Sequence, residues 1–217
     1  MYPVTIVDNF FKDPDAVVQL AESLEYHSSD GAWPGKRTKL LYTINQETEL
    51  LFEYFGSRVH SLFYETAPDF WEIDIRFQKI DSYHDEKYNK KNRGWIHRDD
   101  HANFGGIVYL TKDPEKDTGT SIYKPKNEFT CQFENCLSAK EDLYLGENKF
   151  SDDEYENCFD RLNDQYIETV TIENVYNRLV LFDGNTYHGV KTFGKSQRLT
   201  LSFFGISIGG KQFPLHR

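Results

Sequence analysis

Two histidines and one aspartate have the residue types and the spacing of a metal site. His97 and Asp99 stand two positions apart in a segment that we interpret as an extended strand. Alternate residues of a strand point to the same face, so an imidazole and a carboxylate can reach one ion. His188 lies in a later strand-like stretch, and a sheet that closes on itself could bring it beside the first pair. Such a ligand set leaves coordination positions of the ion open for other molecules.

Arg198 could hold the far end of a molecule bound at that metal. It stands ten positions after His188 and begins an alternating run in which Thr200 shares its face. A planar guanidinium with a nearby hydroxyl matches a carboxylate group. Tyr109, on another predicted strand, could donate a phenol hydrogen bond to the same carboxylate. Two histidines and one carboxylate form the facial triad of non-haem Fe(II) oxygenases. A keto-acid co-substrate that chelates such an iron needs a clamp of this kind at its other end.

The same motifs resemble those of the Fe(II)/2-oxoglutarate-dependent dioxygenase superfamily, whose fold is the double-stranded β-helix, or jelly roll. His97-Arg98-Asp99 matches its His-x-Asp motif, His188 its distal histidine, and Arg198-Leu199-Thr200 its Arg-x-Ser/Thr motif. His-x-Asp alone is a weak signal, whereas the three motifs at these spacings on predicted strands are specific in combination.

Two further segments are similar to the prolyl-hydroxylase-like branch of that superfamily. Tyr109-Leu110-Thr111 is similar to its Tyr-Leu-Asn strand. Residues 119–123 are similar to its Gly-Gly-Thr-x-Phe strand, with Thr118 in place of the first glycine. The opening residues 7–11 and the later residues 34–37 resemble an uncharacterised bacterial and phage branch.

The resemblance implies a site, cofactors and a reaction. Fe(II) would be held by His97, Asp99 and His188. The 5-carboxylate of 2-oxoglutarate would be bound by Arg198, Tyr109 and Thr200. With O2 as oxidant, and ascorbate as a reductant that supports turnover, the reaction would release succinate and CO2 while hydroxylating a substrate. That substrate would be a protein side chain, with prolyl as one candidate, or a small metabolite.

Two other functions remain open from the residues. A zinc-dependent hydrolase could use His97, His101 and His188 as ligands, with Asp99 or Asp100 as the base. A non-catalytic jelly-roll binding protein could carry the motifs by descent, although every motif residue is present. Asp100, His101 or the polar loop at 86–93 could contact a substrate. Residues 33–37 could line the mouth of the site or only pack against the N-terminal helices.

The helices and strands expected around these residues indicate a single domain over 1–217. We predict that this domain is mainly β with N-terminal helices. Asp13 and Pro14 are typical of a helix start, and a second helix is expected over 46–65. These helices would make residues 1–69 a helical support. Residues 70–208 alternate as about eight strands, which favours a jelly-roll core. We expect a loop over 27–39, and an acidic insertion at 128–166 with one helix near 152–164.

Composition excludes several other classes of protein. The 217 residues carry a net charge of −10, which argues against nucleic-acid partners and against binding to anionic membranes. No apolar run is long enough for a transmembrane helix, and the first residues lack the pattern of a signal peptide. Cys131, Cys136 and Cys158 cannot all pair with one another and are interpreted as free thiols. A reducing, cytoplasmic setting is therefore expected.

Overall fold

The computed structural model describes residues 4–62, 70–128, 130 and 133–209. Its strands are β1 (Val4–Val7), β2 (His27–Ser28), β3 (Lys36–Arg37), β4 (Phe70–Ile80), β5 (Phe104–Tyr109), β6 (Thr120–Pro125), β7 (Tyr166–Ile172), β8 (Leu179–Asp183), β9 (Tyr187–Val190) and β10 (Arg198–Gly209). Its helices are α1 (Pro14–Ser23), α2 (Gln46–Ser61), α3 (Glu134–Leu145) and α4 (Asp152–Asn163), with short 3-10 turns η1 (Leu41–Thr43) and η2 (Lys90–Asn92).

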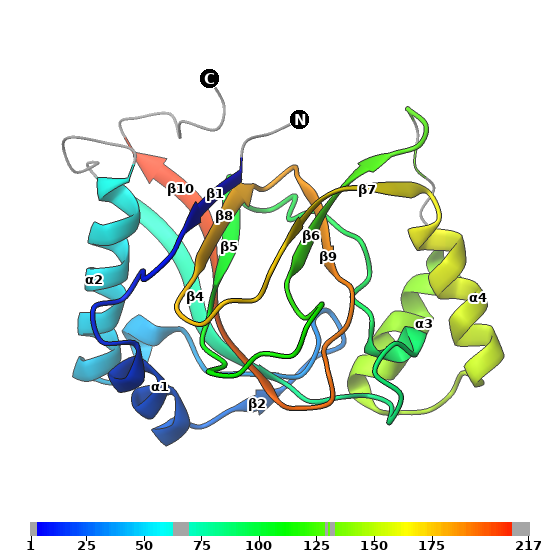
Figure 1. Cartoon of the computed structure of the whole chain (residues 1–217), viewed down its shortest axis with the longest axis horizontal. Coiled ribbons are helices and arrows are strands. Elements are labelled where there is room, and N and C mark those ends of the chain that lie inside the picture. The colour runs from blue at the N-terminus through cyan, green and yellow to red at the C-terminus, as the bar shows by residue number, and fades with distance from the viewer. Residues whose placement is uncertain (1–3, 63–69, 129, 131–132, 210–217) are drawn as a thin grey trace.

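Two antiparallel sheets face each other between two pairs of helices (Figure 1). The large sheet has the order β1-β8-β5-β10-β4-β3-β2, and the small sheet has the order β7-β6-β9. Tyr109, Val180 and Phe182 of the large sheet pack against Ile122 and Ile172 of the small sheet, which fills part of the space between them. This arrangement confirms the predicted jelly roll, mainly β with N-terminal helices.

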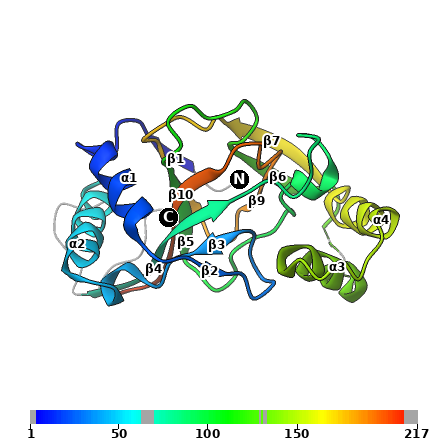
Figure 2. The same ribbon diagram turned by 90° about the horizontal axis from the view of Figure 1, so that it is seen from below.

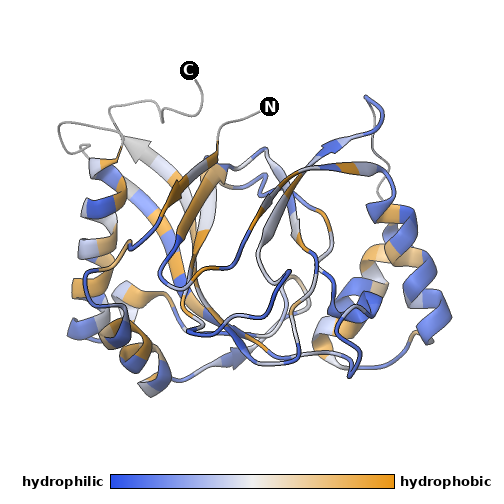
Figure 3. Cartoon of the chain, in the orientation of Figure 1, coloured by the Kyte–Doolittle hydropathy of each residue, from blue (hydrophilic) through white to orange (hydrophobic). Residues whose placement is uncertain are grey.

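Helices α1 and α2 cover the outer face of the large sheet. Helix α1 begins where the sequence predicted, because the Asp13 side chain accepts a hydrogen bond from the Ala16 N–H at 3.0 Å and Pro14 fits the first turn. Phe55 of α2 is fully buried against Phe203 of β10, with ring centroids 4.8 Å apart. Strand β8, which lies between β1 and β5 in the same sheet, is almost continuously hydrophobic (Figure 3), as expected for a strand with both faces covered.

Strand β10 divides its side chains between this outer core and the inner space. Leu199, Leu201 and Phe203 belong to the core under the helices. Arg198 and Ser202 line the space between the sheets. Because strand side chains alternate in direction, this register carries polar residues inward and apolar residues outward.

Two expectations about the appended elements were wrong. The insertion at 128–166 contains two helices, α3 and α4, where the sequence predicted one. The expected loop at 27–39 contains β2 and β3, which extend the large sheet beyond β4. Strands of two residues are too short to show a period in the sequence. The part of the α2 prediction beyond residue 62 lies outside the described residues, as does Cys131.

The insertion packs at the opposite end of the molecule from α1 and α2 (Figure 2). Its two helices form a separate apolar cluster around Trp95, which includes Tyr155 and Phe159. Cys136 and Cys158 also lie in this cluster as free thiols. Among the described residues, no helix combines the length and the hydrophobicity needed to cross a bilayer.

Candidate active site

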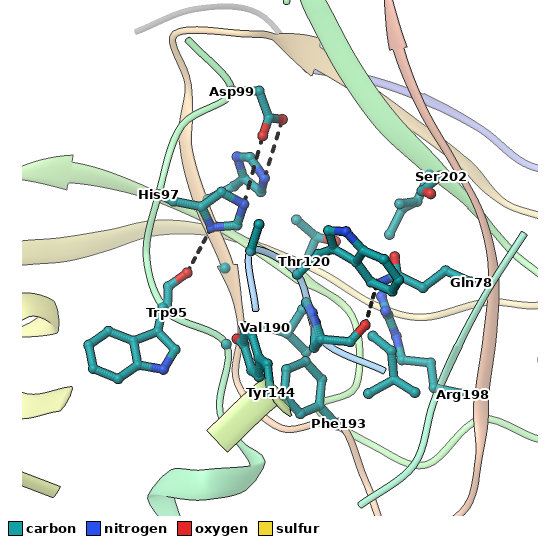
Figure 4. Close-up of a pocket in the computed structure, with 18 of the residues that line it drawn as sticks. Gln78, Trp95, His97, Asp99, Thr120, Tyr144, Val190, Phe193, Arg198 and Ser202 are labelled. Atoms are coloured by element: carbon teal, nitrogen blue, oxygen red, sulfur yellow. Dashed lines mark hydrogen bonds and ion pairs between the residues drawn. The ribbon is translucent and has the colours of Figure 1, made fainter. Parts of the chain in front are cut away.

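His97, Asp99 and His188 lie together in a cavity between the sheets (Figure 4). Each offers one ligand atom, and these atoms all lie within 4.8 Å of one another. His97 Nε2 lies 3.8 Å from Asp99 Oδ1, and His188 Nε2 lies 3.7 Å from Asp99 Oδ2. The structure therefore brings together the three residues that the sequence singled out as metal ligands.

Backbone carbonyls orient both imidazole rings. Nδ1 of His97 lies 2.8 Å from the Trp95 carbonyl oxygen, and Nδ1 of His188 lies 2.9 Å from that of Thr186. A neutral ring that donates from Nδ1 keeps its lone pair on Nε2, the atom that faces Asp99. The pKa of His97 is lowered mainly by two causes. The larger is the partial burial of its half-exposed ring, and the second is the adjacent His188 ring. Both effects favour the neutral form, which is the form that binds metals.

Asp99 shows that the cluster fits a cation. The residue is 6% exposed, and its buried Oδ2 has no hydrogen-bond partner among the described residues. A buried carboxylate oxygen without a partner costs free energy, which a bound cation would offset. Gly105 of β5 leaves room for this oxygen, because a Cβ there would lie 2.9 Å from it. Two neutral imidazoles and one carboxylate suit a divalent transition-metal ion.

The segment that carries His97 and Asp99 is extended but is not a strand, which corrects the prediction. His97 pairs with His188 through one isolated bridge, with N–O distances of 3.0 and 2.8 Å. The Ile96 N–H instead donates to the Asn163 side chain of α4 at 2.8 Å. The insertion thus satisfies a backbone group that a neighbouring strand would otherwise satisfy.

Arg198 begins β10 and lies in the same cavity as the cluster. The residue is 5% exposed, and its Nε donates to the Thr118 carbonyl oxygen at 3.1 Å. Its Nη2 is buried and has no hydrogen-bond partner among the described residues. Burial lowers the pKa of Arg198, while the adjacent Tyr109 acts in the opposite direction. Because an arginine stays charged in proteins, this guanidinium can receive a carboxylate.

Tyr109 and Thr200 lie opposite each other on β5 and β10. Both are fully buried, and the Tyr109 hydroxyl donates to Thr120 Oγ1 at 2.7 Å. The Tyr109 ring centroid lies 5.5 Å from the guanidinium carbon of Arg198. Thr120 and Arg198 line the cavity, whereas Tyr109 and Thr200 stand behind this lining. Direct contact of either residue with a co-substrate therefore stays a prediction.

Four residues that line the same cavity were not assigned to the site from the sequence. The cavity has a volume of about 130 Å³. Lys140 and Tyr144 enter it from α3, and Trp33 and Arg37 enter it from the 29–37 segment. No period or motif marked Lys140 or Tyr144, because their place depends on how the insertion packs. For Trp33 and Arg37, lining the mouth of the site was one of the two alternatives that the sequence left open for their segment.

A second cavity, of about 460 Å³, adjoins the first. Both cavities share Trp95, His97 and Lys140 as lining residues. Tyr166 and Tyr187 form an aromatic pair along the second cavity, with ring centroids 4.8 Å apart. His97 of the cluster therefore lies where two spaces meet, one toward Arg198 and one toward this tyrosine pair.

His101 and Asp100 are placed outside the metal-competent group of the described residues. The His101 ring lies 5.4 Å from the ring of Phe204. Asp100 pairs with Arg98 Nε at 2.5 Å and lines the second cavity. The zinc-hydrolase alternative counted His101 as a ligand, and this geometry gives that role no support.

The polar loop at 86–93 is attached to the insertion. Lys90 pairs with Asp160 at 2.7 Å, and Lys91 pairs with Asp152 at 2.5 Å. Inside the loop, Asn92 is fully buried, and its side chain bonds to backbone groups of residues 83–86. The two ion pairs attach the loop to α4.

Comparisons with solved structures define the class of this fold. One is a prolyl hydroxylase from Trichoplax adhaerens in complex with a peptide fragment of the hypoxia inducible factor oxygen degradation domain. It is similar with a TM-score of 0.53 and 15% identity over 93% of this chain and 82% of that chain. A 2OG-Fe(II) oxygenase family oxidoreductase from Burkholderia pseudomallei is similar with a TM-score of 0.56 and 9% identity over 95% and 85%.

A third similar structure is HygX from Streptomyces hygroscopicus with nickel and 2-oxoglutarate bound. Its TM-score is 0.56, with 11% identity over 93% of this chain and 82% of that chain. The fold is thus the jelly roll of the 2OG-Fe(II) oxygenases, in agreement with the resemblance seen in the sequence.

The family profile gives a second, more specific assignment. The chain belongs to DUF6445, described as a family of unknown function, whose profile matches residues 1–197. Among curated proteins, no sequence match was found. The matched range includes His97, Asp99 and His188 and ends one residue before Arg198.

Proposed function

We propose that this protein is an Fe(II)- and 2-oxoglutarate-dependent oxygenase. The observation that carries the proposal is the His97–Asp99–His188 cluster in one cavity with the buried, incompletely paired guanidinium of Arg198. The cluster fits a divalent ion, and the guanidinium fits the distal carboxylate of a dicarboxylic keto acid. The jelly-roll fold shared with 2OG-Fe(II) oxygenases supports the same function.

Each residue would have a distinct task. His97, Asp99 and His188 would hold Fe(II), and Arg198 would bind the 5-carboxylate of 2-oxoglutarate. Tyr109 would position Arg198, and Thr200 would offer its unpaired Oγ1 to the same carboxylate. Bound iron would supply the oxidative chemistry with O2, and the chain would supply the ligands and the orientation of the co-substrate. Succinate and CO2 would be released, and ascorbate would support turnover.

The substrate would be a protein side chain, with prolyl as one candidate, or a small molecule. One similar structure is a prolyl hydroxylase with a bound peptide, and another is HygX with hygromycin B bound. The second cavity, which has a volume of about 460 Å³ and is lined by His97 of the cluster, is large enough for a side chain or a small metabolite. The reaction is expected to take place inside the cell, where thiols stay reduced.

The direct test is an anaerobic titration of the full-length protein with Fe(II) and then 2-oxoglutarate. Chelation of the keto acid to the iron should produce a weak visible charge-transfer band, and Arg198→Gln should shift its appearance to higher 2-oxoglutarate concentration. The matched control is Arg178→Gln, since Arg178 is paired with Asp8 at 2.6 Å and lies away from the cavity. An iron-loaded protein without the band would contradict the proposed function.

A zinc-dependent hydrolase is the alternative function, and metal content separates the two. A hydrolase would retain Zn(II) and show no response to 2-oxoglutarate. A non-catalytic binding protein would bind neither Fe(II) nor 2-oxoglutarate with useful affinity. Metal analysis of the purified protein, together with the titration above, distinguishes all three.

A further inference from the structure

The cavity beside the metal-competent cluster contains more positive charge than the proposed metal and co-substrate can use. Three cationic side chains line it: Arg37, Lys140 and Arg198. Asp99 is the one carboxylate among the described lining residues. For a chain with a net charge of −10, this is a local reversal of sign.

A simple balance of charges shows which cations remain. Fe(II) and Arg198 would carry three positive charges, and Asp99 with the 2-oxoglutarate dianion would carry three negative charges. The metal, its carboxylate ligand, the co-substrate and Arg198 are therefore neutral together. Arg37 and Lys140 are left without a counter-charge in the cavity, which is costly unless a ligand provides one.

Arg37 is held in place but is not neutralised. Its guanidinium carbon lies 4.6 Å from the Trp33 ring centroid and 5.7 Å from that of Phe204. Its Nη2 makes one long hydrogen bond of 3.4 Å to Gln78 Oε1, and Gln78 is itself anchored by donating to the Pro34 carbonyl oxygen at 2.7 Å. No carboxylate among the described residues lies within ion-pair distance of it. A stacked guanidinium of this kind is ready to bind a planar or tetrahedral oxyanion.

Of the three acids that act on Arg37, Asp74 is paired with Arg76, Asp99 is the carboxylate counted above with the metal, and Asp30 has the smallest effect. Both carboxylate oxygens of Asp74 accept hydrogen bonds from Arg76, at 2.8 and 3.3 Å. Asp30 accepts a hydrogen bond from the Ala32 N–H at 3.1 Å. Burial lowers the pKa of Arg37 to about 10, so the guanidinium still carries its charge at neutral pH.

Lys140 lines the same cavity from α3. Its ammonium lies 5.8 Å from the Tyr144 ring centroid and forms no ion pair among the described residues. It lines both cavities and therefore stands where they meet. Burial lowers the pKa of Lys140, and the nearby acids Glu141 and Asp99 act against this effect.

The two walls contact each other. A Cβ on Gly31 would lie 3.3 Å from Glu141 Cβ, so the 29–37 segment touches α3 next to Lys140. The Gly35 N–H donates to the Tyr83 hydroxyl at 2.8 Å, and the Tyr83 ring packs on Tyr144 with centroids 5.8 Å apart. Arg37 and Lys140 therefore line one cavity from two elements that contact each other.

We propose that the substrate carries an oxyanion, a carboxylate or a phosphate, that binds between Arg37 and Lys140 beside the His97–Asp99–His188 cluster. The inference rests on the proposed function for the reaction that follows, but the anion site itself depends only on Arg37 and Lys140. The remainder of such a substrate would extend into the second cavity, along Tyr166 and Tyr187.

The test measures anion binding while 2-oxoglutarate occupies Arg198. The full chain is loaded with diamagnetic Zn(II) and 2-oxoglutarate, and the probes are acetate, inorganic phosphate and neutral acetamide. Saturation-transfer NMR of the two methyl probes and ³¹P NMR of phosphate report binding. We expect saturable binding of an anion and none of acetamide. Arg37→Gln and Lys140→Gln should each weaken anion binding about tenfold, which corresponds to about 1.4 kcal/mol.

The control variant Arg178→Gln removes the same charge from a surface ion pair and should leave anion binding unchanged. Equal binding of acetate and acetamide, unchanged affinity in both cavity variants, or no saturable binding of either anion to the wild type would overturn the proposal. If Arg37→Gln does not fold, Lys140→Gln carries the test alone. The anion that binds with the higher affinity, acetate or phosphate, indicates whether the substrate carries a carboxylate or a phosphate.

The same samples separate this inference from the proposed function. If the wild-type protein does not bind 2-oxoglutarate, the proposed oxygenase function is contradicted. The anion site is then tested by measuring anion binding to the metal-free Arg198→Gln protein. A loss of anion binding in Arg37→Gln with 2-oxoglutarate affinity retained would support the anion site specifically.

Discussion

The two halves of the cavity wall are built by different rules. Arg198 and the cluster residue His188 stand on strands, where the alternation of side chains fixes their direction. Lys140 lines the cavity from α3 of the insertion, and Arg37 lines it from β3, a two-residue strand beyond β4 near the edge of the large sheet (Figure 2). The first half would hold the metal and co-substrate, and the second half would meet the substrate.

This difference suggests how one fold can keep its chemistry while changing its substrate. Inward positions on paired strands are coupled through the register of a whole sheet, so a change there disturbs many contacts. The appended wall is fixed by its own small core around Trp95 and by a few contacts of the 29–37 segment. It can therefore vary with less effect on the sheets.

The largest expected effect comes from breaking the half of the cavity that would hold the metal. Asp99→Ala should lower the affinity for Fe(II) or Zn(II) by more than about 100-fold and abolish turnover, because it removes a ligand and not only its support. Calorimetric titration with Zn(II) measures the affinity. The control is Asp100→Ala, since Asp100 lies outside the cluster and pairs with Arg98. Unchanged Zn(II) affinity in Asp99→Ala would contradict the assignment of Asp99 as a metal ligand.

A second pair of variants compares the cores of the two regions. Phe159→Ala in the insertion and Phe55→Ala under the large sheet should each cost about 3–5 kcal/mol, since both rings are almost fully buried. We expect the first change to accelerate hydrogen exchange mainly in α3 and α4, and the second to accelerate it throughout the large sheet. If Phe159→Ala speeds exchange in β5 and β10 as much as in α3, the two regions are one cooperative unit.

A third variant tests the co-substrate end of the strand-based half. Arg198→Gln should weaken 2-oxoglutarate binding by about 30- to 100-fold, because a charged fork that can bind a carboxylate at two points is lost. Binding of Zn(II) alone should stay within about twofold, since Arg198 is not part of the cluster. Competition between 2-oxoglutarate and succinate, followed by NMR, measures the change. Equal 2-oxoglutarate affinity in variant and wild type would rule out the clamp role.

The smallest expected effect concerns the turn that leads into Arg198. Glu115 Oε1 accepts hydrogen bonds from the N–H groups of Lys195 and Ser196, at 2.6 and 2.8 Å. Partial burial tends to raise the pKa of Glu115, but these N–H groups and the ammonium of Lys87 outweigh it and lower the pKa below 4.5. Glu115→Gln should therefore cost about 1 kcal/mol at neutral pH.

The pH dependence of that effect follows from the direction of the shift. A carboxylate with a lowered pKa in the folded state stabilises the protein above its unfolded-state pKa, and this contribution disappears as the pH falls through the folded-state value. Thermal melts of wild type and Glu115→Gln should therefore converge as the pH falls below about 4. A constant difference in melting temperature between pH 7 and pH 3 would contradict the assignment.

The strand-based half could be predicted from the sequence because its signals are local. Because Arg198 and Thr200 alternate with Leu199 and Leu201, both the strand and its inward face could be predicted. The spacing of His97 and Asp99 predicted that their side chains point to the same side. This prediction holds although the segment forms a single β-bridge and is not a full strand. Extended backbone alone is enough for that alternation.

Only part of the appended half could be predicted, and its two helices show why. Helix α4 is preceded by Ser151, whose side chain forms a capping box with that of Glu154, a signal that is readable in the sequence. Helix α3 begins after Phe133, which makes no side-chain cap, so its start carries no local signal. Lys140 depends on this helix. Arg37 depends on a two-residue strand whose pairing with Gln78 is set only by the tertiary fold.

The single bridge between His97 and His188 has a consequence for folding. It joins two segments that are far apart in the sequence, and it does so through the backbones of two cluster residues. A divalent ion held by both rings would act there as a removable cross-link that closes a long loop of chain. The free energy of unfolding would then rise by about 1.4 kcal/mol for each tenfold increase in free metal above its dissociation constant. The abundance of the folded protein would thereby follow the metal supply of its surroundings.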